Sequence, residues 1–157
     1  MNIFVLDENP DVAATLHNDK HCVKMIVEIA QLLSTAHHVV GSKYADQLYR
    51  KTHENHPCAK WVRESKANYK WTYLLFVALC REYTYRYGRD HKTMVEKGQL
   101  LSNIPNLPDV SLTKFEQCMP EDCRVEGDAV SAYRKYYKEH KSHIANWKKR
   151  PVPAWAA

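Results

Sequence analysis

The fold is decided by the segment DKHCVKMIVEIAQLLSTAHH, residues 19–38. Upstream of it, Asn9 followed by Pro10 supplies a helix cap and a proline at the first helical position. We therefore expect one long helix that starts near Pro10 and runs to about His38. The apolar residues of the segment recur at spacings of three and four, which is the period of an α-helix: Cys22, Met25, Ile26, Ile29, Leu32, Leu33 and Ala36.

The rest of the chain predicts more helices. Pro57 is expected to open a second long helix that ends at Gly88, residues 92–101 to form another, and Asp128 to cap a last one. Residues 3–6 form a strand or an extended arm, residues 42–52 hold a short helix, and residues 104–127 form a long irregular connection. The predicted fold class is mainly α: a compact bundle of three to five helices with a short N-terminal extended segment.

Length and composition indicate one globular unit. A chain of 157 residues with 45% hydrophobic and 26% charged residues can bury a single core. We expect residues 1–157 to form a single globular domain, with residues 150–157 as an extended C-terminal tail. No internal repeat or low-complexity tract argues for another organisation.

The sequence lacks the usual signals for a membrane span, for secretion and for a disulfide framework. No apolar run approaches the roughly 18 residues that a membrane span needs, and the N-terminus has no basic secretory leader. The five cysteines are odd in number and contain no C-x-x-C pair, so neither a disulfide framework nor a zinc ribbon is indicated. We expect a cytoplasmic protein with reduced cysteines and no membrane partner.

A row of polar residues follows one face of the first long helix. Between Cys22 and Leu33 the only polar residues are Lys24, Glu28 and Gln31, so this helix should be buried except along that line. A carboxylate in such a place is costly unless it is paired or used. The whole row is spaced by alternating fours and threes: His17, His21, Lys24, Glu28, Gln31, Thr35 and His38.

Three interpretations of the row remain open. Glu28 can be a catalytic carboxylate that His21 and Lys24 tune or help by contacting phosphate. Alternatively, His17, His21 and Glu28 can bind a metal ion, although no H-E-x-x-H motif accompanies them. In the structural interpretation Glu28 pairs with Lys24 across one turn and the histidines are partly exposed.

Two weaker polar clusters lie further along the chain. The loop with His53, Asn55 and His56 could close over the row on the first helix. Asn68 lies on a smaller polar line of the second long helix, with Ser65 and Thr72. Such residues serve more often as helix caps or satisfied structural groups than as ligands, but Asn68 is retained as a candidate substrate contact, with His17 and Gln31.

The net charge of +5 is concentrated near the C-terminus. Residues 133–150 carry seven basic residues against one acid, and Tyr133, Tyr136, Tyr137 and Trp147 are interleaved with them. Cations for phosphates beside aromatic faces for bases are typical of a nucleic-acid or nucleotide surface. A solvated helix with one buried aromatic edge has the same composition, so this pattern alone leaves both possibilities open.

Together these residues resemble the phage pyrimidine-dimer DNA glycosylases of the endonuclease V type, and also small tailed-phage proteins near that family. The similarity is carried by the short apolar N-terminus, by Asp19-Lys20-His21 with Glu28 seven residues after the histidine, and by the late YRKYY stretch, residues 133–137. As an order of elements it spans most of the chain. Its two specific motifs, the His-to-Glu spacing and the tyrosine cluster, are short.

The resemblance implies roles for particular residues. In that family a glutamate on the first long helix stabilises an imine formed when the N-terminal amine attacks the sugar. Carried over to this sequence, the resemblance implies that Glu28 is catalytic and that His21 binds substrate. It also implies a nucleic-acid surface formed by Tyr133, Lys135, Tyr136 and Tyr137. Two features differ: bulky Asn2 follows Met1, where the family has a small residue that becomes the terminus, and Val27 and Gln31 replace two arginines that flank the family's glutamate.

The leading hypothesis is an enzyme that cleaves an N-glycosidic or adjoining phosphodiester bond in DNA or a nucleotide. Its catalytic residues would be Glu28, His21 and Lys24, without cofactor or metal. A second hypothesis is a phage protein that binds, sequesters or degrades a soluble, even cyclic, nucleotide immune signal; a third is a metal-dependent hydrolase. The expected partners are DNA or a small nucleotide, for a monomer or small homo-oligomer in the host cytoplasm if the protein is phage-encoded.

Overall fold

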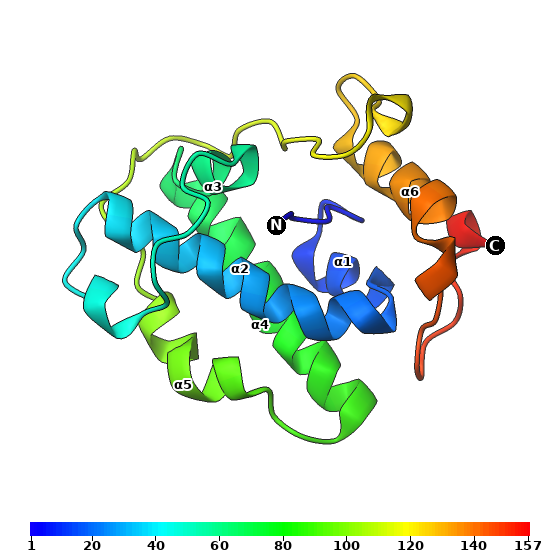
Figure 1. The fold of residues 1–157 in the computed structure, drawn as a ribbon, viewed down its shortest axis with the longest axis horizontal. Coiled ribbons are helices and arrows are strands. Elements are labelled where there is room, and N and C mark those ends of the chain that lie inside the picture. The colour runs from blue at the N-terminus through cyan, green and yellow to red at the C-terminus, as the bar shows by residue number, and fades with distance from the viewer.

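The computed structural model describes residues 1–157 and contains helices without any β-strand (Figure 1), which confirms the predicted mainly α class. Short 3₁₀ helices occur at Ala45–Gln47, Glu121–Cys123, Ser142–Ile144 and Ala154–Ala156. The α-helices are α1 (Pro10–Leu16), α2 (Asp19–Val39), α3 (Pro57–Val62), α4 (Lys66–Tyr87), α5 (Lys92–Leu101) and α6 (Ala129–His140).

The long helix expected from Pro10 to His38 is two helices. The chain becomes extended at His17 and Asn18, and the Asn18 side chain accepts a hydrogen bond from the backbone N–H of His21, which starts α2. The apolar period continues across this break, but the local cap at Asn18 prevails over it. His17 therefore lies outside the helix that carries the rest of the polar row.

The second long helix is also divided. α3 ends at Val62, and the Ser65 hydroxyl accepts a hydrogen bond from the Asn68 N–H to start α4. The other predicted ends are confirmed: α4 stops at Gly88 in the left-handed conformation (φ 73°), α5 covers residues 92–101, and Asp128 caps α6.

α2 and α4 pack against each other at the centre of the molecule, and α1, α3 and α5 contact this pair. A continuous core contains 35 buried apolar residues, among them Trp61, Tyr69 and Phe76. Residues 3–6 form no strand: they are an extended arm, fully buried in that core. No helix of the structure has both the length and the apolar character to cross a membrane.

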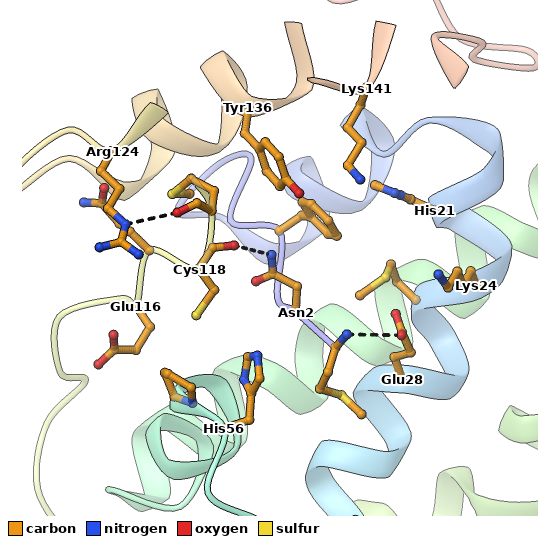
Figure 2. Close-up of a pocket in the computed structure, with 16 residues that line it drawn as sticks. Asn2, His21, Lys24, Glu28, His56, Glu116, Cys118, Arg124, Tyr136 and Lys141 are labelled. Carbon is orange, nitrogen blue, oxygen red and sulfur yellow. Dashed lines mark hydrogen bonds and ion pairs between the residues drawn. The ribbon is translucent and has the colours of Figure 1, made fainter. Parts of the chain in front are cut away.

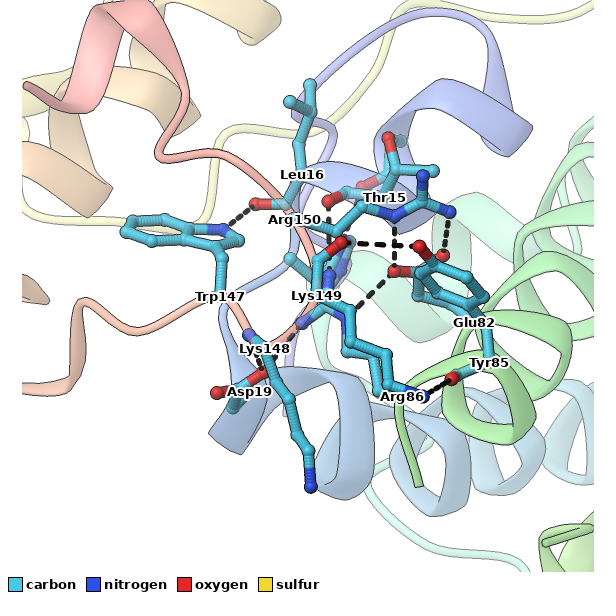
Figure 3. Close-up of polar contacts among 12 residues, drawn as sticks. Thr15, Leu16, Asp19, Glu82, Tyr85, Arg86, Trp147, Lys148, Lys149 and Arg150 are labelled. Carbon is cyan, nitrogen blue, oxygen red and sulfur yellow. Dashed lines mark hydrogen bonds and ion pairs between the residues drawn. The ribbon is translucent and has the colours of Figure 1, made fainter. Parts of the chain in front are cut away.

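The C-terminal segment folds back over α1 and α4 (Figure 3). Trp147 Nε1 donates to the Leu16 carbonyl at 2.8 Å, and Arg150 donates to both carboxylate oxygens of Glu82 at 2.8 and 2.9 Å. The predicted tail is thus irregular only as far as Pro153, where the last 3₁₀ turn begins. This anchoring holds α6 beside the N-terminal arm, so that both border the same cavity.

Candidate active site

A pocket of about 630 Å³ opens between the N-terminal arm, α2, the start of α3, the connection before α6, and α6 itself (Figure 2). α2 supplies one wall through His21, Lys24 and Glu28, the middle of the predicted polar row. Their spacing of three and four residues places them on one face of the helix. As predicted, α2 is otherwise mostly buried: of its residues from Cys22 to Leu33, only Val23, Lys24, Val27, Glu28 and Gln31 reach solvent.

Glu28 forms an ion pair with the N-terminal amine. The Met1 nitrogen lies 3.5 Å from Glu28 Oε1, and the side chains of both residues are mostly buried, at 5% and 19% exposure. Lys24, expected as the partner of Glu28 in the structural interpretation, makes no ion pair with it. The carboxylate therefore faces a primary amine across the pocket floor.

Asn2 holds the N-terminal arm in place. Its amide nitrogen donates to the Cys118 carbonyl at 2.7 Å, and its Oδ1 accepts from the Ile3 N–H at 2.8 Å and from the Tyr133 hydroxyl at 3.1 Å. Because this side chain is buried and fully paired, the position of the preceding amine is fixed by the fold.

His21 is held as a neutral imidazole. Burial, with smaller contributions from the neighbouring His17 and the surrounding lysines, lowers its pKa to about 3. Its Nδ1 lies 2.6 Å from the Tyr137 hydroxyl, and burial keeps the pKa of that tyrosine well above its usual value. Tyr137 thus keeps its proton. We assign the hydroxyl as the donor to Nδ1, an assignment that puts the hydrogen of the neutral His21 ring on Nε2.

Aromatic side chains from the N-terminal arm and α6 also line the pocket. Phe4 stacks on His21 with ring centroids 4.4 Å apart, and Tyr136 of α6 is nearly parallel to Phe4 at 6.1 Å. Lys141 Nζ lies 5.1 Å from the centre of the Tyr136 ring. A planar group could stack on Tyr136 there while Lys141 stays beside it.

The charges around the pocket are mainly positive. Lys24, Arg124, Lys141 and the Met1 amine line it, against the two carboxylates Glu28 and Glu116. Only Met1 and Glu28 form an ion pair among these groups. The remaining cations are available for an anionic ligand such as a phosphate.

A family model described as pyrimidine dimer DNA glycosylase matches residues 1–95. The chain belongs to the pyrimidine dimer DNA glycosylase family. No curated protein and no solved structure gave a significant match. The matched region of this glycosylase-family protein contains Met1, His21, Lys24, Glu28 and His56, whereas the wall formed by the connection before α6 and by α6 lies beyond it.

Several predicted contacts lie outside the pocket of this family member. His17 is fully buried with its Nδ1 2.7 Å from the Ala13 carbonyl, and Gln31 lies a turn beyond Glu28, half-buried and away from the cavity. Asn68 is buried between Trp61 and Thr113, to which its amide nitrogen donates. Burial or internal hydrogen bonds thus occupy His17 and Asn68, and Gln31 is not part of the cavity lining.

Only one of the four predicted C-terminal contacts lines the cavity. Tyr136 does, whereas Tyr133 and Tyr137 are buried behind it and position Asn2 and His21. Lys135 points the other way and donates to the Asp122 carbonyl at 2.7 Å. A helix turns neighbouring residues by about 100°, so a run of consecutive aromatic residues cannot all face one cavity.

The alternative interpretation, a metal site of His17, His21 and Glu28, is not assembled in the structure. These three residues do not form one of the groups whose ligand atoms lie within 4.8 Å of one another. The helix break at Asn18 and the bonds of His17 and Glu28 to other partners separate them. The groups that do come together are His56 with Cys58 and Cys118, and Asp122 and Cys123 with Glu139 and His140.

The sequence prediction missed Asn2, Glu116, Cys118 and Arg124, and it used Lys141 only as one of the basic residues near the C-terminus. His56 was noted in a loop that could close over the polar row; it both caps α3 and lines the pocket. Burial lowers the pKa of His56, and the nearby N-terminal ammonium lowers it further. The basic excess near the C-terminus was the one sequence signal that pointed toward Lys141.

Proposed function

We propose that this protein is a DNA glycosylase and abasic-site lyase that acts on damaged pyrimidines, with the Met1 amine as nucleophile and Glu28 as its catalytic carboxylate. The observation that carries the proposal is the 3.5 Å approach of the Met1 nitrogen to Glu28 Oε1 inside a cationic pocket. Membership of the pyrimidine dimer DNA glycosylase family supports the same chemistry. The family's usual small N-terminal residue is replaced in this proposal by Met1 itself.

The amine must lose a proton before it can attack. Glu28 is the acceptor that faces it, so we assign to Glu28 the transfer of that proton. The neutral amine then bonds to C1′ of the deoxyribose and the glycosidic bond breaks. The base leaves with the bonding electron pair and takes up the proton that Glu28 had accepted. As the C1′–O4′ bond opens, one proton of the attached nitrogen passes to O4′, which leaves a positively charged imine that the Glu28 carboxylate stabilises.

The lyase step follows from the same intermediate. Loss of a proton from C2′ expels the 3′ phosphate and breaks the strand, and water then hydrolyses the imine and restores the amine. We assign to Lys24, Lys141 and Arg124, which line the pocket, the contacts with the phosphates. We assign to Tyr136 the stacking of a base and to the Nε2–H of His21 a hydrogen bond to the nucleotide.

Trapping with borohydride tests the proposal directly. The purified protein is incubated with duplex DNA that holds either a pyrimidine dimer or an abasic site, and the imine is reduced to a stable adduct. We expect an adduct whose peptide map places the DNA on the N-terminal residue. Glu28→Gln should lower the rate of adduct formation at least about 100-fold, because the amine loses its proton acceptor and the imine its counter-charge.

Glu96→Gln is the matched control, since Glu96 is an exposed glutamate on α5 far from the pocket. It should leave the rate unchanged. Mass spectrometry of the intact protein should show Met1 retained with a free amine. An adduct on a lysine, or equal rates for Glu28→Gln and the wild type, would contradict the assignment of Met1 and Glu28.

A second candidate function is the binding or degradation of a free nucleotide. The size of the pocket, about 630 Å³, favours it, because small-molecule sites commonly have such volumes. Calorimetry that measures binding of damaged duplex DNA and of mononucleotides or cyclic dinucleotides distinguishes this function from the glycosylase function. Tight nucleotide binding without DNA binding or any trapped adduct would replace the glycosylase proposal.

A further inference from the structure

Two thiols from distant parts of the chain meet at the edge of the pocket. Cys58, in the first turn of α3, is 1% exposed, and Cys118 belongs to the connection between α5 and α6. Their sulfur atoms lie 3.4 Å apart, although 60 positions separate them in the sequence. Both are free cysteines, and no other pair of cysteines is in hydrogen-bond contact.

His56 completes a three-residue group with these thiols. Its Nδ1 accepts a hydrogen bond from the Cys58 N–H at 3.1 Å, which fixes the ring beside the sulfur and leaves Nε2 without a protein partner. One ligand atom from each of His56, Cys58 and Cys118 lies within 4.8 Å of the other two. Figure 2 shows His56 and Cys118 at the same side of the pocket as Asn2.

We infer that His56, Cys58 and Cys118 form a binding site for a thiophilic divalent cation, specifically zinc, with the fourth coordination position open to the pocket. Zinc binds cysteine sulfur at about 2.3 Å and histidine nitrogen at about 2.0–2.1 Å in tetrahedral geometry. Two sulfurs on one such ion lie ~3.8 Å apart by that geometry. The thiol pair needs to widen by only a few tenths of an ångström to accept the ion.

Charge balance also suits a zinc ion at this mostly buried position. The ion displaces one proton from each thiol, and two thiolates with a neutral imidazole compensate its two positive charges. Asn2 Oδ1, 3.5 Å from the Cys58 sulfur, is engaged by the Ile3 N–H and the Tyr133 hydroxyl, so we assign no protein atom to the fourth position. Water or a ligand atom can occupy it, as in zinc sites with three protein ligands.

The other candidate group suits zinc less well. Asp122, Glu139 and His140 are exposed, only Cys123 offers sulfur, and His140 is already 3.4 Å from an Asp122 oxygen. Exposed carboxylates are also well hydrated without a metal ion. Cys123 therefore provides an internal comparison: removing its sulfur should leave the proposed site intact.

Cobalt substitution tests the site without any DNA substrate. Co²⁺ titrated into the metal-free, reduced protein should give thiolate-to-cobalt charge-transfer absorption and tetrahedral visible bands that saturate at one ion per chain. Zn²⁺ should then abolish both bands by displacing the cobalt. Cys118→Ser and His56→Gln should each weaken Co²⁺ binding at least about 100-fold, because each removes a ligand, whereas Cys123→Ser should bind as the wild type does.

Thermal unfolding monitored by circular dichroism checks whether each variant is folded. If Cys118→Ser is not folded, Cys118→Ala replaces it. Counting the free thiols of the denatured protein, as purified, shows whether Cys58 and Cys118 are joined in a disulfide. The inference is overturned if the wild type shows no thiolate-to-cobalt band, if the Cys123 variant loses it, or if a Cys58–Cys118 disulfide remains after reduction and excludes the ion. None of these outcomes bears on imine trapping, so failure here is distinct from failure of the proposed glycosylase activity.

Discussion

Two clusters of charged side chains differ in how completely their charges are paired. In the cluster of Figure 3, Arg86 contacts Glu82 at 2.7 Å and Asp19 at 3.0 Å, and Arg150 closes on the other oxygen of Glu82 at 2.8 Å. In the pocket, the only ion pair joins Met1 to Glu28. The charges of the first cluster are thus paired with one another, whereas the pocket holds cations without an ion-pair partner that a ligand can contact.

The pKa of Glu82 reflects this internal pairing. Burial alone would raise the pKa of this carboxyl, but hydrogen bonds from Arg150 and Arg86 hold it below its ordinary value. The cluster thus joins α4 to the start of α2 and to the C-terminal segment. Buried charges that are fully paired with each other, as here, are explained by the fold alone, and such partners are visible only in the tertiary structure.

The largest effect on stability is expected from breaking the paired cluster. Arg86→Met leaves the buried Glu82 carboxylate with Arg150 alone and should lower the free energy of unfolding by about 3–5 kcal/mol. Urea unfolding monitored by circular dichroism measures it. The exposed Arg81→Met on the same helix is the control and should change stability by less than about 0.5 kcal/mol; equal losses would show that Arg86 acts through helix propensity alone.

Acid should destabilise the protein through His17, which lies beside the paired cluster. Complete burial lowers the pKa of His17 from 6.5 to about 4. Between these values the unfolded chain binds more protons than the folded one, so stability is full above pH 6.5 and is lost as the pH falls toward 4. This lowering of the His17 pKa corresponds to a loss of up to about 3 kcal/mol in the free energy of unfolding.

Urea unfolding at pH 7 and pH 4.5 measures this loss. His17→Gln should lose about 2 kcal/mol less stability over this interval than the wild type, because the titrating imidazole is gone. His143→Gln, which replaces an exposed histidine, is the control and should follow the wild type. If the His17 variant has the same pH dependence as the wild type, burial of His17 is not the cause of the acid sensitivity.

The smallest expected effects come from the unpaired cations of the pocket. Lys24→Gln and Lys141→Gln should each reduce the slope of log Kd against log salt for DNA binding by about 1, because each removes one phosphate contact. Stability should change by less than about 0.5 kcal/mol, since no ion pair is broken. Fluorescence anisotropy at several salt concentrations measures the slopes, and Lys70→Gln, an exposed lysine of α4, should not alter them.

Sequence reasoning succeeded where the deciding interactions are local. The bounds of α5, the glycine end of α4 and the Asp128 cap of α6 depend on residues within one turn. It failed at the breaks before α2 and α4, where Asn18 and Ser65 act as caps inside continuous apolar periods. Periodicity reports which face is buried, and a buried face can continue from one helix to the next.

The sequence alone determined the helical class and the common face of His21, Lys24 and Glu28, because the pitch of a helix fixes side chains three and four residues apart. Only the tertiary structure decided that Met1 lies opposite Glu28, that Tyr137 orients His21, and that Cys58 meets Cys118. Those contacts join residues 27 to 116 positions apart. Packing of the whole core sets such distances, and no local spacing encodes them.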